Sequence, residues 1–221
     1  MYYLILFLTL IITSLSQSYI NSMYKKSRVI PSKSNMTGKE VARRILDANG
    51  LKKVKIQEVA GTLSDHYDTR NKTVNLSKDI YENTSLASIS VAAHECGHAI
   101  QDKEGYLFLR IRSSIIPLVN FASRVGYIII LISIVMSLIK LLWIGILMEV
   151  VILAFQVITL PVEFNASSRA LKQILDLKIV EKDEHTTCYG MLRAAALTYV
   201  ASVATAILEI VRLLWMTRSD D

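Results

Sequence analysis

Four long hydrophobic runs, separated by polar segments, set the pattern of the chain. The first, MYYLILFLTLIITSLSQSYI, holds about 20 residues without a charge, which is enough to cross a ~30 Å hydrocarbon core. A cleaved signal peptide carries basic residues before its apolar stretch, whereas here Lys25, Lys26 and Arg28 follow it. The pattern therefore predicts a retained transmembrane anchor over residues 1–20, with its N-terminus outside.

The second and third runs form one apolar stretch, from Val125 to Val162, that is interrupted by Lys140 and Glu149. At about 1.5 Å per residue a helix of this length is too long for one crossing and suits a hairpin of two. The apolar residues IIPLVNFAS extend its first arm upstream. We therefore predict a transmembrane hairpin over residues 113–162, with Lys140 at its turn.

The fourth run, MLRAAALTYVASVATAILEIVRLLW, is rich in Ala, Ser and Thr, which suits close packing of helices in a membrane. Glu209 and Arg212 lie three residues apart and can pair on one helix face. A buried or interfacial helix is the alternative. The pattern favours a fourth transmembrane helix over residues 194–216.

The polar segment 21–112 carries the excess positive charge. It contains 16 Lys or Arg and 10 Asp or Glu, and this difference of +6 equals the formal charge of the whole chain. The positive-inside rule places the segment in the cytoplasm, together with residues 163–193 after the hairpin returns. Two cysteines, Cys96 and Cys188, are too few for a disulfide framework and agree with that compartment. We expect a multi-pass protein of the cell membrane that contacts lipid and binds no nucleic acid.

Short elements are predicted inside the polar segment. In TGKEVARRILDANG, Thr37 is the expected N-cap, Glu40 completes a capping box and Gly50 ends the helix. VKIQEV reads as a strand, and DHYDTRNKTVNLS as a turn between two short strands. Ser85 then opens a helix through LASISVAAHECGHAIQ.

That last helix carries the motif HExxH, formed by His94, Glu95 and His98. Positions i and i+4 share one helix face, so both imidazoles can bind one Zn²⁺ ion and leave a position open for water. Glu95 lies about 100° round the helix from His94, where it can act as general base toward that water. The motif predicts zinc-dependent hydrolysis, with a polypeptide as substrate.

The third zinc ligand must return to the same side of the membrane as the HExxH helix. Glu163 follows the hairpin directly, in LPVEFNASSRA, and is favoured on position. Glu149 is too deep in the membrane, and Glu104 lies where the HExxH helix should end. The remaining candidates lie in a charged, solvated stretch: Asp176, Glu181, Asp183 and Glu184.

Other residues have two readings each. TVNLS, residues 73–77, is either an edge strand that pairs with an extended substrate or a structural strand. His66 and Tyr67 are candidate donors to the oxyanion. Arg169 either shares that task or holds a carboxylate, the second being favoured, and Cys96 is expected to be a packed small residue.

The quoted segments SVAAHECGHAIQ, LPVEFNASSRAL, DHYD and VNLS resemble those of the YugP-like neutral zinc metallopeptidases, small bacterial membrane proteins, over almost the whole chain. These look related to HtpX-type quality-control proteases and to CAAX prenyl proteases. The resemblance implies zinc on His94, His98 and Glu163, with Glu95 as general base. It also makes membrane protein quality control one candidate role. Where the larger relatives place an aspartate that orients a zinc-bound histidine, this chain has Ser167, and Asn165 is a second candidate for that task.

The predicted fold is thus an α-rich α+β integral membrane protein. It has about four transmembrane helices and a small cytoplasmic zincin-like metallopeptidase unit over residues 21–112, with the third ligand on a helix within residues 163–193. The predicted function is a membrane-embedded zinc endopeptidase of the gluzincin type. A site-2 type intramembrane protease fits less well, because it takes its third ligand from an Asp-Gly pair. A non-catalytic zinc-binding membrane factor is the alternative from another class, although a structural site has no use for Glu95.

Overall fold

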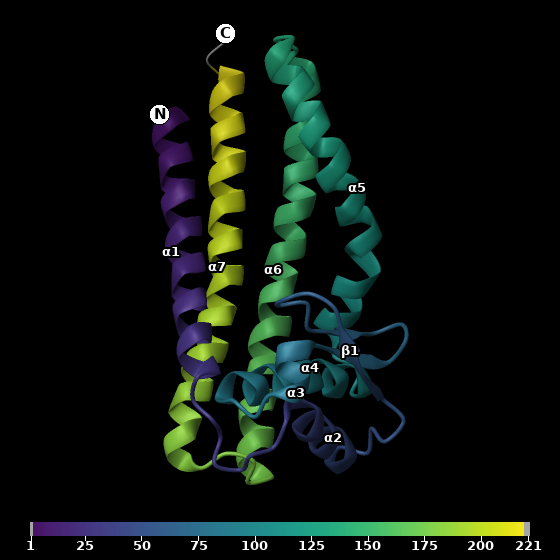
Figure 1. Ribbon diagram of the computed structural model, residues 1–221. Helices are drawn as coiled ribbons and strands as arrows, with labels where there is room; N and C mark the ends of the chain where they lie inside the picture. Colours follow the sequence, from purple (N-terminus) through teal and green to yellow (C-terminus); the bar gives the residue numbers. More distant parts are fainter. Residues whose placement is uncertain (1, 219–221) are drawn as a thin grey trace. The chain divides into compact units, whose positions relative to one another are not determined.

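The computed structural model describes residues 2–218, and these are mostly helical (Figure 1). The elements in chain order are α1 (Tyr2–Arg28), α2 (Gly38–Ala48), β1 (Lys55–Val59), β2 (His66–Asp68), β3 (Thr73–Ser77), α3 (Lys78–Glu82), α4 (Leu86–Lys103), α5 (Leu107–Val135), α6 (Ile139–Asp176) and α7 (Lys182–Arg218).

The chain forms two compact units. We call the first the apolar unit: Met1–Gln17, Ile111–Leu160 and Leu197–Asp221. We call the second the polar unit: Ser18–Arg110 and Pro161–Ala196. Each of the four long helices, α1, α5, α6 and α7, contributes residues to both units.

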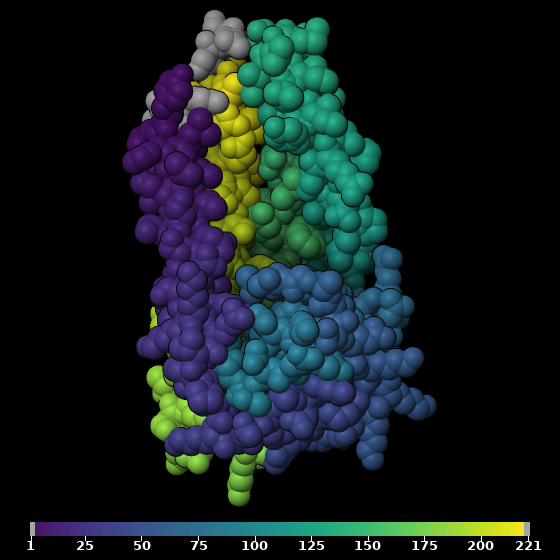
Figure 2. Space-filling view, in the orientation of Figure 1, coloured from purple at the N-terminus to yellow at the C-terminus, as the bar shows by residue number. Residues whose placement is uncertain are grey.

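The apolar unit exposes large hydrophobic side chains. Among residues 2–218, the four long helices are each long and apolar enough to cross a membrane. More than half of the residue surface is exposed at Phe7, Leu10, Tyr127 and Leu147. In Figure 2 no other segment covers the near side of α1, drawn in purple. Contiguous apolar surface of this kind is unfavourable in water and suits a lipid surrounding. The hydropathy pattern predicted about four such helices, as expected for a membrane protein.

Short turns end the helices that follow the polar segment. α5 ends at Val135, and Ser137 adopts a left-handed conformation (φ 54°) between α5 and α6. Lys140, predicted at this turn, is instead the second residue of α6, because the backbone N–H of Leu138 closes onto the Ser133 carbonyl before it. The segment 163–193 is divided between α6 and α7, since Lys178 (φ 51°) ends the first of these helices in the same way.

The polar unit contains a three-stranded sheet with strand order β1-β3-β2. β1 pairs with β3 in parallel, with Lys55 opposite Thr73, and β2 pairs with β3 antiparallel, with His66 opposite Asn75. β3 is therefore the central strand, and all five of its residues are buried. Of the two readings of residues 73–77, the edge strand is wrong and the structural strand is right, because β3 lies between β1 and β2 and its residues 73–75 are paired on both sides.

A hydrophobic core joins α2, α4 and the sheet. Its members that have no exposed surface include Val41, Ile45, Val74, Leu76 and Ile89, and burying one such side chain contributes about 1.5–3 kcal/mol. α2 starts as predicted: Glu40 accepts from the backbone N–H of Thr37, whose hydroxyl accepts from the N–H of Glu40. α4 starts at the predicted N-cap, where the Ser85 side chain accepts from Ser88 N–H. The core thus fixes the helix that carries HExxH.

Candidate metal centre

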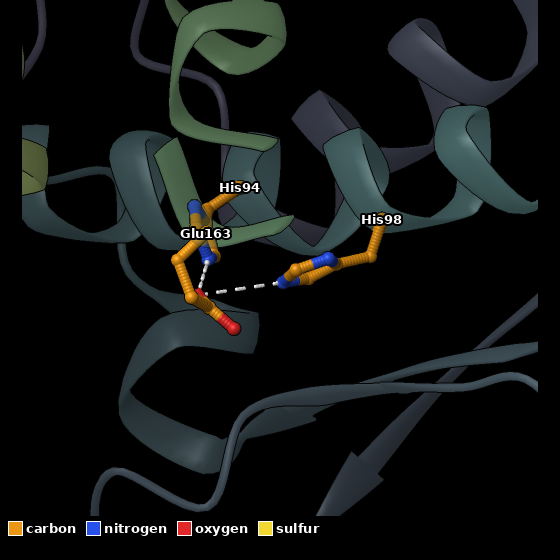
Figure 3. Close-up of side chains that lie close together, drawn as sticks. All are labelled: His94, His98 and Glu163. Carbon is orange, nitrogen blue, oxygen red and sulfur yellow. Dashed lines mark hydrogen bonds and ion pairs between the residues drawn. The ribbon is translucent and has the colours of Figure 1, made fainter. Parts of the chain in front are cut away.

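Two helix segments of the polar unit bring His94, His98 and Glu163 together. His94 and His98 are one turn apart on α4, and Glu163 comes from α6, two residues after Pro161. Figure 3 shows the Glu163 carboxylate facing both imidazole rings. Its Oε2 lies 3.2 Å from His94 Nε2 and 3.7 Å from His98 Nε2. The ligand-type atoms of all three residues lie within 4.8 Å of one another.

Gly97 lets the two segments approach this closely. A Cβ atom at Gly97 would lie 2.5 Å from the backbone oxygen of Ala166, which is closer than real Cβ contacts allow. Ala166 is three residues past Glu163 on α6. A glycine inside HExxH therefore sets the distance between the histidines and the carboxylate.

The donor set fits zinc. Two imidazole nitrogens and one carboxylate oxygen are one of the common ligand sets of catalytic zinc sites, which keep a fourth position open. Tetrahedral ligands about 2.0–2.1 Å from the ion are roughly 3.3 Å apart, and the separations of 3.2 Å and 3.7 Å are close to this value. Glu163 is only 2% exposed, and a carboxylate this deeply buried needs positive charge beside it.

Each histidine has a hydrogen-bond partner on its other ring nitrogen. Ser167 Oγ lies 3.2 Å from His94 Nδ1, so the serine stands where it was expected to act. Gln101 Oε1 lies 3.0 Å from His98 Nδ1. Asn165 contacts Gln101 instead of either imidazole. Gln101 was not among the residues predicted from the sequence, although its position three residues after His98 on one helix places it within reach.

Glu95 is buried beside the cluster. It is 7% exposed, and its burial raises the pKa of its carboxyl to about 7. The neighbouring His94 opposes this rise in pKa, and the charge of Glu163 adds to it. A carboxyl with such a pKa can both accept and release a proton near neutral pH.

The predicted oxyanion donors lie outside this cluster of ligands. His66 Nδ1 lies 2.8 Å from the Ser64 carbonyl, and Asn75 contacts the other nitrogen of the ring. The Tyr67 hydroxyl donates to Asp102. Burial raises the pKa of Tyr67 above its usual value, and this hydrogen bond adds to the rise. The structure thus gives both side chains other partners, and their part in oxyanion binding stays a prediction.

Three of the other carboxylates considered as ligands, Glu104, Glu181 and Asp183, have partners elsewhere in the described structure. Arg169 pairs with Glu104 at 2.7 Å, as the favoured reading of this arginine holds. Lys33 pairs with Glu181 and Asp183, each at 2.8 Å. Cys96 is buried, with its thiol 3.6 Å from the Ala42 carbonyl, and is a packed residue as predicted.

The chain is similar to known metallopeptidases and proteases. Residues 2–218 match the family described as "Putative neutral zinc metallopeptidase". The chain is 42% identical over 212 residues to the "Putative membrane protease YugP" of Bacillus subtilis (strain 168), a match that covers 95% of this chain and 94% of that protein. No solved structure matches the chain.

A helical membrane protein whose HExxH helix meets a carboxylate from a second helix has the features of a membrane metallopeptidase. The chain belongs to the family described as "Putative neutral zinc metallopeptidase" and is YugP-like, as the resemblance implied.

Proposed function

We propose that this protein is a membrane-embedded, zinc-dependent endopeptidase of the gluzincin type. The observation that carries the proposal is the convergence of His94 and His98 from α4 with Glu163 from α6. The family and the relative named a membrane protease support it.

In this proposal the three side chains hold the metal and Glu95 moves the proton. A zinc ion at this site would supply Lewis acidity, which makes water more acidic and polarises the scissile carbonyl. Glu95 accepts the proton of the attacking water and passes it to the leaving amine. Because Glu95 is buried beside the ligands, bulk water does not compete for its carboxylate.

The sheet offers one edge beside the HExxH helix. β2 is a terminal strand of the sheet, and it packs on α4, whereas the central β3 is paired on both sides. We propose that an extended polypeptide substrate adds to β2 through backbone hydrogen bonds. The edge strand for the substrate is then β2, and not residues 73–77, for which that role was one of two readings.

The proposed compartment is the cytoplasmic side of the cell membrane, with the helices crossing it several times. The 16 basic against 10 acidic residues of segment 21–112 support this orientation. Membrane lipid is then a constant partner, and membrane proteins that have lost their fold are the substrate class we propose. A reporter fused after residue 60 should give a cytoplasmic signal, and an external signal would overturn the orientation.

The experiment compares purified wild type with Glu95→Gln in detergent, with an unstructured protein as substrate and bound zinc measured in both. Glu82→Gln, an exposed acid on α3, is the matched control. We expect all three to hold zinc, and cleavage to fall by about a thousandfold or more in Glu95→Gln alone, because only that variant loses the base.

Equal cleavage by wild type and Glu95→Gln would refute the proposed role of Glu95. Zinc in every variant with cleavage in none would instead favour a non-catalytic zinc-binding membrane factor.

A further inference from the structure

Gln101 is a fully buried amide in contact with residues of both helices at the metal centre. It lies three residues after His98 on α4, and its exposed fraction is 0%. Its Oε1 lies 3.0 Å from His98 Nδ1. Its Nε2 donates to the Val162 carbonyl at 2.8 Å and to Asn165 Oδ1 at 3.0 Å. All of these groups belong to the polar unit.

Two fixed groups determine which end of this amide faces His98. The Val162 carbonyl can only accept a hydrogen bond, so the NH₂ group of Gln101 must face it. Arg169 can only donate, and its Nε donates to Asn165 Oδ1 at 2.7 Å, so this oxygen is also the atom that faces Gln101. The amide oxygen of Gln101 is therefore the end that points at His98.

The position of the hydrogen on the His98 ring follows from this orientation. Because an amide oxygen can only accept, His98 Nδ1 must carry the ring hydrogen. The lone pair of the neutral imidazole then lies on Nε2, which faces Glu163 Oε2 at 3.7 Å. Two acceptors that face each other across a buried site are satisfied by a cation between them.

The other end of the amide holds the segment that supplies the third ligand. Val162 immediately precedes Glu163, and Asn165 follows it by two residues. A carboxylate at position 101 could accept from His98 but could not donate to either α6 group. An amide of this length does both, whereas Ser167 contacts His94 alone.

We propose that Gln101 is the positioning residue of the metal centre, which fixes the tautomer of His98 and fastens the α6 segment that carries Glu163. The inference rests on the proposed function only in assuming that these three residues bind zinc. A single neutral side chain would then couple two ligands that lie on different helices, His98 on α4 and Glu163 on α6.

The test measures zinc affinity by competition with a chelator, together with the visible absorption spectrum of the Co²⁺-substituted protein. Gln101→Met removes both kinds of hydrogen bond and keeps the length of the side chain. Gln101→Glu keeps the acceptor for His98 and loses the donors to α6. Gln173→Met is the matched control, because Gln173 is an amide on α6 that bonds Asn49, away from the histidines.

We expect Gln101→Met to weaken zinc binding about 10–100-fold and to change the Co²⁺ spectrum, as loss of a group that orients a metal ligand does. Gln101→Glu should lose less affinity, between about 2- and 10-fold, since one of its two contacts survives. Gln173→Met should stay within about twofold of wild type. Should Gln101→Met fail to fold, the Gln101→Glu result decides by itself.

Unchanged zinc affinity and spectrum in the Gln101 variants would overturn the inference and leave the proposed function intact. An equal loss of affinity in Gln173→Met would overturn it as well, since the effect would then be a general loss of stability. Absence of zinc binding in wild type would overturn the inference and the proposed function together.

Discussion

In the apolar unit Tyr127 and Leu147 are 70% and 59% exposed, whereas in the polar unit Ile45 and Ile89 are 0% exposed. The two units contain similar side chains and place them in opposite surroundings. Hydropathy alone predicts the helices of the apolar unit, because any apolar side chain is favourable in a lipid surrounding. The polar unit depends on particular contacts, so a single substitution should matter far more there.

The largest difference is expected from removing one apolar side chain in each unit. Ile89→Ala leaves a cavity in the polar unit and should lower the free energy of unfolding by about 2–5 kcal/mol. Leu147→Ala removes a more exposed side chain and should change it by less than about 1 kcal/mol. Unfolding of both variants in detergent measures this comparison, and equal losses would show that the apolar unit is packed as tightly as the polar unit.

A smaller difference is expected between two helical glycines of the polar unit. Gly97→Ala brings a methyl group against the Ala166 backbone and should cost about 1–3 kcal/mol, while weakening zinc binding because Glu163 lies on that helix segment. Gly190→Ala meets only the end of the Met23 side chain, which can move away. Since alanine favours a helix, this control should be neutral or stabilising. Tight zinc binding in Gly97→Ala would contradict the role given to this close approach.

Local sequence patterns predicted much of this structure. The capping box of Thr37 and Glu40, the start of α4 after Ser85 and the four apolar helices each depend on residues close together in the sequence. The arrangement of His94 and His98 follows from helix geometry alone. Glu163 was reached by a topological argument, because the chain has to return to the HExxH helix after the hairpin.

The missed features depend on contacts between distant segments. TVNLS alternates polar and apolar residues, a pattern that edge and central strands share. Its central place depends on the parallel pairing with β1, which its own sequence does not encode. Gln101 is a buried polar residue whose partners, Val162 and Asn165, lie more than 60 residues away. Helical spacing brings Gln101 within reach of His98, but its contacts with Val162 and Asn165 exist only once α4 and α6 meet.

The most direct test of the central claim is the amount of zinc bound by Glu163→Ala. Glu181→Ala, which removes an exposed carboxylate from the charged stretch after α6, is the control. If Glu163 from α6 completes the site on α4, purified wild type and Glu181→Ala will hold about one zinc per chain and Glu163→Ala will hold little, with cleavage lost. Full zinc occupancy and normal cleavage in Glu163→Ala would contradict the account, because the two histidines of α4 would then hold zinc without a ligand from α6.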